Sequence, residues 1–277
     1  GLDVVRRRED GYHEVRMIMQ TIHLYDLLEI QKIREPEIQI VSNLSFLPVN
    51  ENNLVYKAAR LLQEEFALTD GISVKLTKRI PVAAGMAGGS TDAAAMLYAM
   101  NQLYDLGLSR RELMKRGVQI GADVPYCLMR GTALAEGIGE KLTQLPPMIK
   151  CPVLIAKPSI SVSTKFVYQN LKLDEQTNHP DIDALMKDIR EKDFDGVCAH
   201  MGNVLESVTI PNYPVIAEIK QQMMRSGAKA SMMSGSGPTV FGLFEDGETA
   251  KRALREMKRS GLAKQVYLTT IYNNRRK

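Results

Sequence analysis

Residues 81–92 read Pro-Val-Ala-Ala-Gly-Met-Ala-Gly-Gly-Ser-Thr-Asp and join a strand pattern to a helix pattern. Before them, residues 72–80 alternate apolar and polar side chains, which predicts a strand with one buried face. After them, an alanine-rich stretch from Ser90 to Leu106 predicts a helix. Glycines at such a junction let the backbone approach a ligand closely, and a helix N-terminus attracts anions. The stretch therefore predicts a phosphate-binding loop, with a plain strand-to-helix turn capped by Ser90 as the alternative.

Two common nucleotide-binding patterns are absent from this loop. No lysine follows the glycines at the spacing of a Walker A loop, and the glycines do not fit the dinucleotide pattern G-x-G-x-x-G. Gly85, Gly88 and Gly89, followed by Ser-Thr-Asp, are more than a simple turn requires. The loop therefore favours a triphosphate ligand and does not indicate a dinucleotide fold.

The composition of the whole chain is that of an ordinary globular protein. Its 277 residues are 44% hydrophobic and 25% charged, and the formal net charge is +4. This length suits one large domain or two modest ones, and so slight a charge does not indicate a nucleic-acid partner. A short basic run, Arg275–Lys277, stands at the end of the chain. No apolar run reaches the roughly 18 residues of a membrane helix and no signal peptide is recognised, so we expect no membrane partner.

The cysteines predict neither cross-links nor a metal site. Cys127, Cys151 and Cys198 are odd in number and widely spaced. Without a CxxC pair or a nearby histidine pair, they support neither a disulfide framework nor a zinc site. We therefore expect a reduced, cytoplasmic location and no metal ligands from the protein.

The order of the predicted elements indicates an α+β fold, because strands dominate the first third and helices much of the rest. We expect strands at 15–22, 27–33, 38–41, 72–80, 153–156, 228–233, 239–244 and 265–272. We expect helices at 54–66, 90–106, 109–121, 163–170, 182–191, 193–202, 214–226 and 247–260. Pro146-Pro147 follows a glycine-rich segment and is the best candidate for a domain boundary.

Residues 81–95 resemble the phosphate-binding signature of the GHMP kinase superfamily, roughly P-x-x-x-G-L-G-G-G-S-S-D-A-A. Met86 stands where leucine is usual and Ala87 where glycine is usual, and neither change removes an N–H donor. The resemblance implies ATP as the phosphoryl donor, with Mg²⁺ bridging its phosphates. The ATP-binding residues that it implies are Pro81, Ala84, Gly85, Met86, Ala87, Gly88, Gly89, Ser90 and Thr91.

Residues 51–62 resemble an E-x-N-L motif whose asparagine lies near the adenine, which implies a nucleotide role for Asn53. A helix N-cap is the alternative for Asn53 and is compatible with that role. Lys75 and Lys78, on the strand before the glycine loop, are candidates for nucleotide contact, although exposed strand lysines usually only face solvent.

Residues 121–126, Gly-Ala-Asp-Val-Pro-Tyr, and the following 131–140 resemble one branch of the superfamily, the kinases of cytidine-diphosphate-linked methylerythritol. The resemblance implies that Asp123 is the catalytic base. An alcohol kinase needs a carboxylate within reach of the hydroxyl, to accept its proton and orient it. The alternative is that Asp123 forms a turn or caps a helix.

Residues 6–15 resemble the R-x-D-G-Y-H pattern of the same branch. The resemblance implies that Tyr12 stacks on a pyrimidine and that His13 hydrogen-bonds the edge of that ring. A turn after Asp10-Gly11 with one packed side chain is the alternative. Residues 157–170 resemble the segment of this branch that supplies an aromatic ring on the other side of the pyrimidine, here Tyr168, and a substrate contact, here Thr164.

Residues 233–239, Met-Ser-Gly-Ser-Gly-Pro-Thr, resemble the third GHMP motif. The resemblance implies that Gly235, Ser236 and Gly237 help to position the phosphoryl acceptor. A flexible hairpin turn is the alternative reading of this stretch.

The resemblance implies a two-domain GHMP kinase fold. An ATP-binding domain like domain 2 of ribosomal protein S5 would span residues 1–147, and a ferredoxin-like substrate domain would span 148–277, its last strand packing on either domain. Members of the branch begin with an A-K-I-N-L segment whose lysine assists the catalytic aspartate. Because this chain opens at Gly1 in mid-strand, we expect that segment to precede it.

Two alternatives remain open beside a small-molecule kinase acting on the cytidyl substrate, as a monomer or homodimer. One is another GHMP kinase, of the homoserine or mevalonate type, which has no need of Tyr12, His13 and Tyr168. The other is a catalytically silent binding protein of the same fold.

Overall fold

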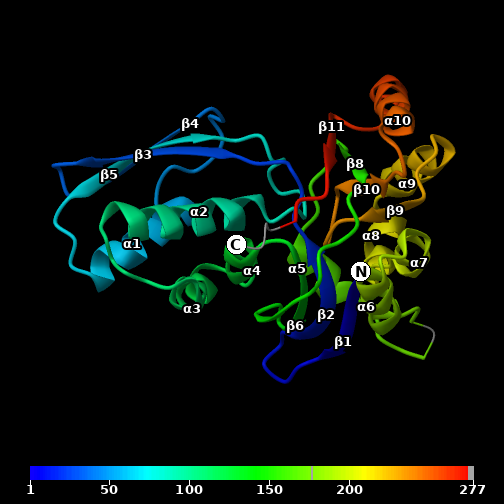
Figure 1. Cartoon of the computed structure of the whole chain (residues 1–277), viewed down its shortest axis with the longest axis horizontal. Coiled ribbons are helices and arrows are strands. Elements are labelled where there is room, and N and C mark those ends of the chain that lie inside the picture. The colour runs from blue at the N-terminus through cyan, green and yellow to red at the C-terminus, as the bar shows by residue number, and fades with distance from the viewer. Residues whose placement is uncertain (176, 274–277) are drawn as a thin grey trace. The chain divides into compact units, whose positions relative to one another are not determined.

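The computed structural model describes residues 1–175 and 177–273, which fold into two compact units (Figure 1). Unit 1 comprises Gly1–His23, Ala83–Met86 and Arg130–Lys277, and unit 2 comprises Leu24–Val82 and Ala87–Met129. Each unit is therefore assembled from separate segments, and the sequence boundary at 147/148 stays a prediction. The basic run at Arg275–Lys277 lies outside the described residues.

Unit 2 is a three-stranded sheet with helices packed beside it (Figure 1). Its strands are β3 (Leu27–Ile33), β4 (Ile38–Ser42) and β5 (Gly71–Thr77), in the order β3-β5-β4. Strand β5 runs antiparallel to β3 and parallel to β4. The helices are α1 (Leu54–Glu65), α2 (Gly88–Leu103), α3 (Arg110–Ile120) and α4 (Val124–Met129).

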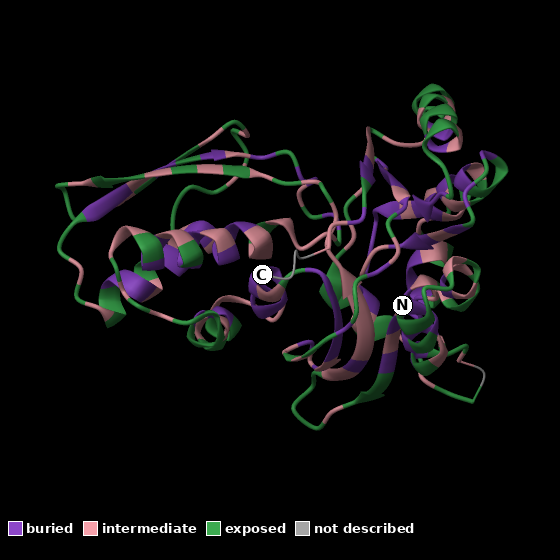
Figure 2. Ribbon diagram, in the orientation of Figure 1, coloured by how far each residue is buried: buried purple, intermediate pink, exposed green. Residues whose placement is uncertain are grey.

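The core of unit 2 follows from the predicted periodicities. Strand β5 buries its alternate residues, and α2 buries the side that carries alanine, methionine and leucine (Figure 2). The fully or nearly fully buried members are Ile72, Val74, Leu76, Ala93, Ala94, Met96, Leu97 and Met100. Burying each of the larger side chains contributes about 1.5–3 kcal/mol, so this apolar face holds the start of α2 in place.

Unit 1 contains two antiparallel four-stranded sheets. The first has the order β1-β2-β6-β7, formed by β1 (Leu2–Arg7), β2 (His13–Gln20), β6 (Thr132–Gly137) and β7 (Lys141–Gln144). The second has the order β11-β8-β10-β9, formed by β8 (Pro152–Lys157), β9 (Ala230–Met233), β10 (Val240–Leu243) and β11 (Gln265–Thr270). The helices are α5 (Thr164–Asn170), α6 (Ile182–Glu191), α7 (Phe194–His200), α8 (Glu206–Asn212), α9 (Val215–Arg225) and α10 (Gly247–Ser260).

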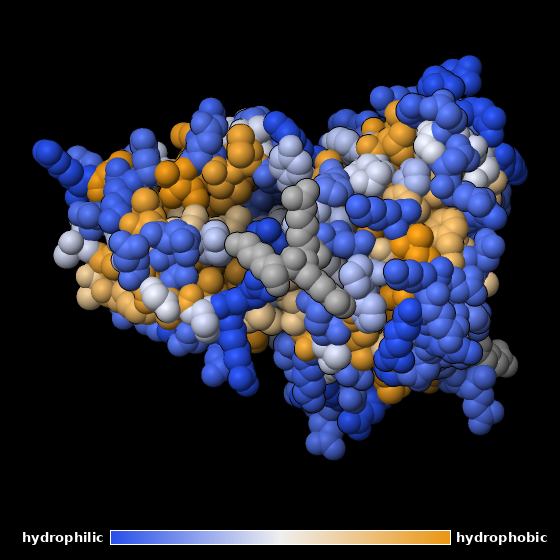
Figure 3. Space-filling view, viewed as in Figure 1, coloured by the Kyte–Doolittle hydropathy of each residue, from blue (hydrophilic) through white to orange (hydrophobic). Residues whose placement is uncertain are grey.

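Helices α9 and α10 pack on the second sheet through apolar stripes at helical spacing. The α9 stripe is Ile216, Ile219 and Met223, and the α10 stripe is Ala250, Ala253 and Met257. The outer face of α10 carries charged side chains, and the surface over this helix is hydrophilic (Figure 3). The two helices therefore cover the sheet whose strands β9 and β10 are joined by the loop at 233–239.

Four elements were not predicted, each for a local reason. Strand β6 reads Thr-Ala-Leu-Ala-Glu-Gly and buries both faces, so it shows no alternation, and its partner β7 is only four residues long. Helix α4 contains Pro125 near its start, and α8 contains Pro211. Both prolines read as helix breakers in a sequence; Pro125 is tolerated because it lies in the first turn of its helix, whereas Pro211 lies near the end of α8. None of the described helices is long and apolar enough to cross a membrane.

Candidate active site

The glycine loop leaves the N-terminus of α2 open. Ala83, Gly85 and Ala87 have left-handed backbone, with φ of 50°, 67° and 50°. Ala87 is the residue before α2, and no side chain caps the helix there. The first N–H groups of α2 therefore face outward at the positive end of the helix dipole. A backbone of this kind fits a polyphosphate.

Packing also explains why glycine occupies the first two positions of α2, Gly88 and Gly89. A Cβ on Gly88 would lie 3.0 Å from Cγ2 of Ile80, and one on Gly89 would lie 3.3 Å from Cδ1 of Leu54. Hydrogen in place of a side chain thus lets α2 begin close to its neighbours in unit 2. The hydroxyl of Thr91 donates to the carbonyl oxygen of Ala87 at 2.9 Å, so it stabilises the first turn of the helix.

The loop at 233–239 is held by hydrogen bonds within unit 1. Ser234 Oγ donates to the carbonyl oxygen of Gly85 at 2.7 Å, and the hydroxyls of Ser236 and Thr164 lie 2.8 Å apart. Asn203 Nδ2 donates to the carbonyl oxygens of Met233 and Gly235 at 2.9 and 2.8 Å. The structure thus brings the predicted residues Thr164 and Ser236 together. Sequence reasoning missed Asn203, which lies outside every motif, and included Ser234 only as part of the stretch 233–239 without giving it a role.

A cavity of about 410 Å³ opens in unit 1 beside the hairpin of β1 and β2. The rings of His13 and Tyr168 lie at its wall, with centroids 5.1 Å apart and planes tilted by 46°. Burial, with a smaller contribution from Arg7, lowers the pKa of His13, which favours the neutral imidazole that can both donate and accept. The residues that line the cavity are Val5, Arg6, Arg7, His13, Tyr168, Gln169, Leu171 and Leu173.

Tyr12 is placed differently from its predicted partners. Its side chain is 62% exposed, and its backbone N–H donates to Asp10 Oδ1 in the tip of the hairpin. It does not line the cavity as the described residues form it. His13 therefore lies against Tyr168 in this structure, and stacking by Tyr12 stays a prediction.

Asp123 lies in unit 2, at the junction of α3 and α4. Its carbonyl oxygen accepts the N–H of Cys127, as the first turn of α4 requires. Burial raises the pKa of the Asp123 carboxyl, because a low-dielectric environment disfavours its charged form. A raised pKa makes a carboxylate a stronger base, which is the direction that a general base requires.

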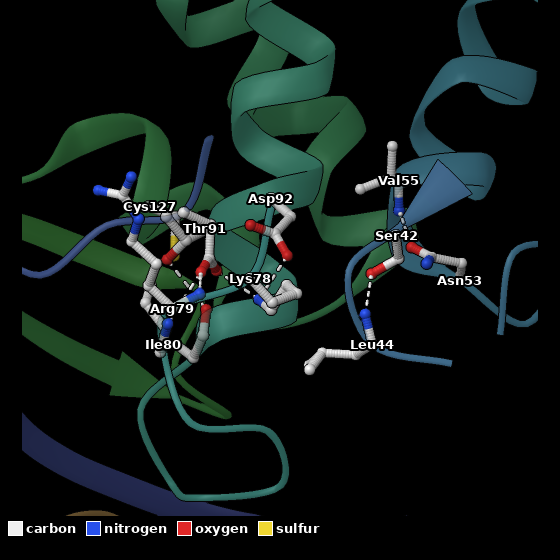
Figure 4. A network of polar contacts seen from close by, with 12 residues as sticks. Ser42, Leu44, Asn53, Val55, Lys78, Arg79, Ile80, Thr91, Asp92 and Cys127 are labelled. Carbon is white, nitrogen blue, oxygen red and sulfur yellow. Dashed lines mark hydrogen bonds and ion pairs between the residues drawn. The ribbon is translucent and has the colours of Figure 1, made fainter. Parts of the chain in front are cut away.

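Asn53 is the N-cap of α1, which was the alternative reading of this residue. Its Oδ1 accepts the N–H of Val55 at 2.9 Å, and its Nδ2 donates to the carbonyl oxygen of Pro48 at 2.6 Å. Figure 4 shows the capping bond between Asn53 and Val55, beside the hydrogen bond between Ser42 and Leu44. A role near the adenine is compatible with this cap and stays a prediction.

Lys78 is not an exposed strand lysine: β5 ends at Thr77, and the Lys78 side chain is buried. Asp26 Oδ1 accepts the backbone N–H groups of Arg79 and Ile80, which holds the chain just after the strand. The Lys78 ammonium donates to Asp26 and to Asp92 Oδ2, the latter at 2.6 Å, and all three side chains are at most 4% exposed. Figure 4 shows the Lys78 and Asp92 side chains pointing toward one another. Lys75, in contrast, pairs with Glu29 on the surface.

The protein offers little to a metal ion by itself. Within residues 1–175 and 177–273, no group of three or more histidine, cysteine or acidic side chains is placed to hold one. Cys127, Cys151 and Cys198 form no disulfide bond within the described residues. The open N–H groups at α2 fit phosphate oxygens, so a Mg²⁺ ion here would be held chiefly by those oxygens.

Comparison with known proteins matches both halves of the chain to GHMP kinases. Residues 53–131 match the family model described as GHMP kinases N terminal domain, and residues 185–263 match GHMP kinases C terminal. A 4-diphosphocytidyl-2-C-methyl-D-erythritol kinase from Lachnospira eligens is 58% identical over 272 residues, covering 98% of this chain and 94% of the relative. A kinase of the same name from Lachnoclostridium phytofermentans is 54% identical over 274 residues, covering 99% and 94%.

Solved structures of GHMP kinases have a similar fold. A crystal structure of 4-(cytidine 5'-diphospho)-2C-methyl-D-erythritol kinase has a TM-score of 0.85 at 30% identity, covering 99% of this chain and 96% of that chain. A homoserine kinase from Cytophaga hutchinsonii has a TM-score of 0.76 at 22% identity, covering 92% and 89%, and so supports the fold alone.

Proposed function

The chain belongs to the 4-diphosphocytidyl-2-C-methyl-D-erythritol kinase family of the GHMP kinases, and from that membership we propose its reaction. It transfers the γ-phosphoryl group of ATP to the 2-hydroxyl of 4-diphosphocytidyl-2-C-methyl-D-erythritol. The products are ADP and the 2-phosphate, in non-mevalonate isoprenoid precursor synthesis. The comparisons confirm the resemblance and the GHMP kinase fold that the motifs predicted.

The cavity beside His13 and Tyr168 is the observation that carries the substrate assignment. An aromatic face can stack on a pyrimidine, and a neutral imidazole can donate to or accept from its edge. Homoserine and mevalonate have no base to stack, so a pocket of this composition supports the cytidyl substrate over theirs. In this proposal the cytosine ring lies between Tyr12 and Tyr168, and His13 hydrogen-bonds its edge.

Asp123 is the proposed base. It accepts the proton of the 2-hydroxyl as the oxygen attacks the γ-phosphorus in line, and it orients that hydroxyl beforehand. General-base help of this kind contributes about 10²–10⁴-fold to the rate. Most of the acceleration comes from positioning and charge stabilisation, because phosphoryl transfer needs little covalent chemistry from the protein.

The glycine loop binds the phosphates in this proposal. The amides of Gly85 to Ser90 face the phosphate oxygens, and Asn53 lies near the adenine. Gly235, Ser236 and Gly237, with Thr164, hold the acceptor side. Mg²⁺, if bound here, would be held chiefly by phosphate oxygens and would supply neutralisation of their charge. The cytoplasmic location and the monomeric or dimeric state remain predictions.

The test is an ADP-release assay on the full-length protein with the cytidyl substrate, homoserine and mevalonate in turn. We expect turnover with the cytidyl substrate alone. Turnover only with homoserine or mevalonate would reject the substrate. Binding of ATP and the cytidyl substrate without turnover would favour the silent binding protein.

A further inference from the structure

The buried cluster of Asp26, Lys78 and Asp92 holds two carboxylates for one ammonium group. The side chains are only 1–4% exposed. Asp92 Oδ1 has no hydrogen-bond partner among the described residues, whereas Oδ2 accepts from Lys78. A buried ion cluster is costly, and apolar residues of similar volume are often at least as stable. Stability alone therefore gives no reason for a second carboxylate here.

The cluster lies at both ends of the glycine loop. Asp26 Oδ1 accepts the backbone N–H groups of Arg79 and Ile80, just before Pro81. Asp92 is in the second turn of α2, just after the loop. A Cβ on Gly88 would lie 3.4 Å from Lys78 Nζ, so the ammonium is beside the first residue of α2. The charge of the cluster thus acts on an anion bound at that helix end.

The charge of the cluster depends on one proton. Burial raises the pKa of Asp92 to about 7, Lys78 opposes that rise, and the charge of Asp26 adds to it. The charged groups that shift the pKa of Asp92 are Lys78, in the segment after β5, and Asp26, in the segment before β3. On helix α4, the Cys127 thiol contacts the hydroxyl of Thr91, the residue before Asp92. With both carboxylates ionised the cluster carries a net negative charge, and with Asp92 protonated it is neutral.

We propose that Asp92 is a positioning residue that couples ATP binding to the uptake of one proton. A polyphosphate at the N-terminus of α2 repels the Asp92 carboxylate and so favours its protonated form. The proton comes from solvent and adds to the unpartnered Oδ1, while Oδ2 keeps its hydrogen bond to Lys78. The cluster then presents no net negative charge to the phosphates. This inference rests on the proposed function only in taking ATP as the nucleotide.

The sign of the effect follows from linkage. A ligand that raises the pKa of a group binds more tightly at low pH and more weakly as pH rises through that pKa. Each unit by which ATP raises the pKa of Asp92 weakens binding about tenfold between the acidic and the alkaline limits. Asp92→Asn has no proton to take up, so its affinity loses that dependence.

The experiment is calorimetric titration of ATP into the full-length protein from pH 6 to 8.5, in buffers of different ionisation enthalpy. Wild type is compared with Asp92→Asn, and with Asp105→Asn as a matched control on an exposed residue. The titration of ATP itself is common to all three, so it cancels in the comparison. We expect greater proton uptake and a steeper loss of affinity with pH in wild type and Asp105→Asn than in Asp92→Asn.

A second measurement follows the titration of Asp92 itself in wild type. In wild type labelled with ¹³C at aspartate carboxyls, we expect the Asp92 carboxyl, assigned by the signal that Asp92→Asn lacks, to titrate near neutral pH with a midpoint that ATP raises. Equal proton uptake in wild type and Asp92→Asn, or a midpoint that ATP leaves in place, would overturn this inference alone. Absence of ATP binding by wild type at every pH would overturn the proposed function with it.

Discussion

The hydroxyl of Ser234 donates a 2.7 Å hydrogen bond to the carbonyl oxygen of Gly85, across 149 residues of sequence. A Cβ on Gly85 would lie 2.2 Å from the carbonyl oxygen of Ser234. Only hydrogen fits at that point, so the glycine loop and the loop at 233–239 meet as backbone against backbone. The two motifs that were predicted separately are therefore parts of one contact within unit 1.

Substituting Gly85 tests this contact. Gly85→Ala places a methyl group against the backbone of Ser234 and also forces alanine into φ of 67°. Gly107→Ala is the matched control, because Gly107 has φ of 68° and nothing within 4 Å of an added Cβ. The control should lose about 1–2 kcal/mol of unfolding free energy from left-handed strain alone. Gly85→Ala should lose clearly more and raise the KM for ATP, measured by urea unfolding and steady-state kinetics. Equal losses in the two variants would mean that the loops do not constrain each other.

Ala87 carries backbone strain where the family usually has glycine. Its φ of 50° and ψ of 28° are left-handed, which costs an alanine about 1–2 kcal/mol, whereas glycine costs about 0.5–1 kcal/mol in conformational entropy. Ala87→Gly should therefore leave stability unchanged or raise it by about 1 kcal/mol in urea unfolding. Ala99→Gly, inside α2, should instead lose about 1 kcal/mol. If both variants are destabilised alike, Ala87 is not strained in solution.

Local chemistry explains why much of the fold was predictable. The alternation of residues 72–80 predicted β5, and Ser109 with Glu112 forms the capping box that begins α3. Where local signals are weak the predictions failed, as in β6, whose small residues are buried on both faces. The glycine loop and the helix after it were predictable because adjacent residues carry the signal, while phosphate binding there stays a prediction.

The rest of the candidate site depends on residues that are distant in sequence. Asp26 and Lys78 are 52 residues apart, and the sequence pattern presented Lys78 as a nucleotide contact or an exposed strand lysine, with no sign of its pairing with Asp26. Asn203 donates to the loop at 233–239, and Ser234 of that loop donates to Gly85, so each contact joins residues that are far apart in sequence. Such pairings are set by the packing of whole elements, so a local pattern does not reveal them.

Tyr168 should determine affinity for the cytidyl substrate. Tyr168→Leu removes the ring that contacts His13 at the cavity, whereas Tyr168→Phe keeps it. Stacking on a base contributes about 1–3 kcal/mol, so the leucine variant should raise the KM for the cytidyl substrate by about 5- to 150-fold. The phenylalanine variant should stay close to wild type, and the KM for ATP should not change in either. A leucine variant with wild-type KM for the cytidyl substrate would place the base elsewhere.

Asp123→Asn should separate catalysis from stability. The raised pKa means that folding opposes ionisation of this carboxyl, so at neutral pH the buried charge works against stability. Asparagine removes that charge, and the variant should unfold at the same or a higher denaturant concentration than wild type. Its kcat should nevertheless fall by about 10²–10⁴-fold, with the KM for ATP retained. In wild type, kcat should decrease as pH falls through the raised pKa, because the base must be ionised, and the residual activity of the variant should lack that decrease. A variant that keeps the same acidic limb in its pH–rate profile would show that another group is the base.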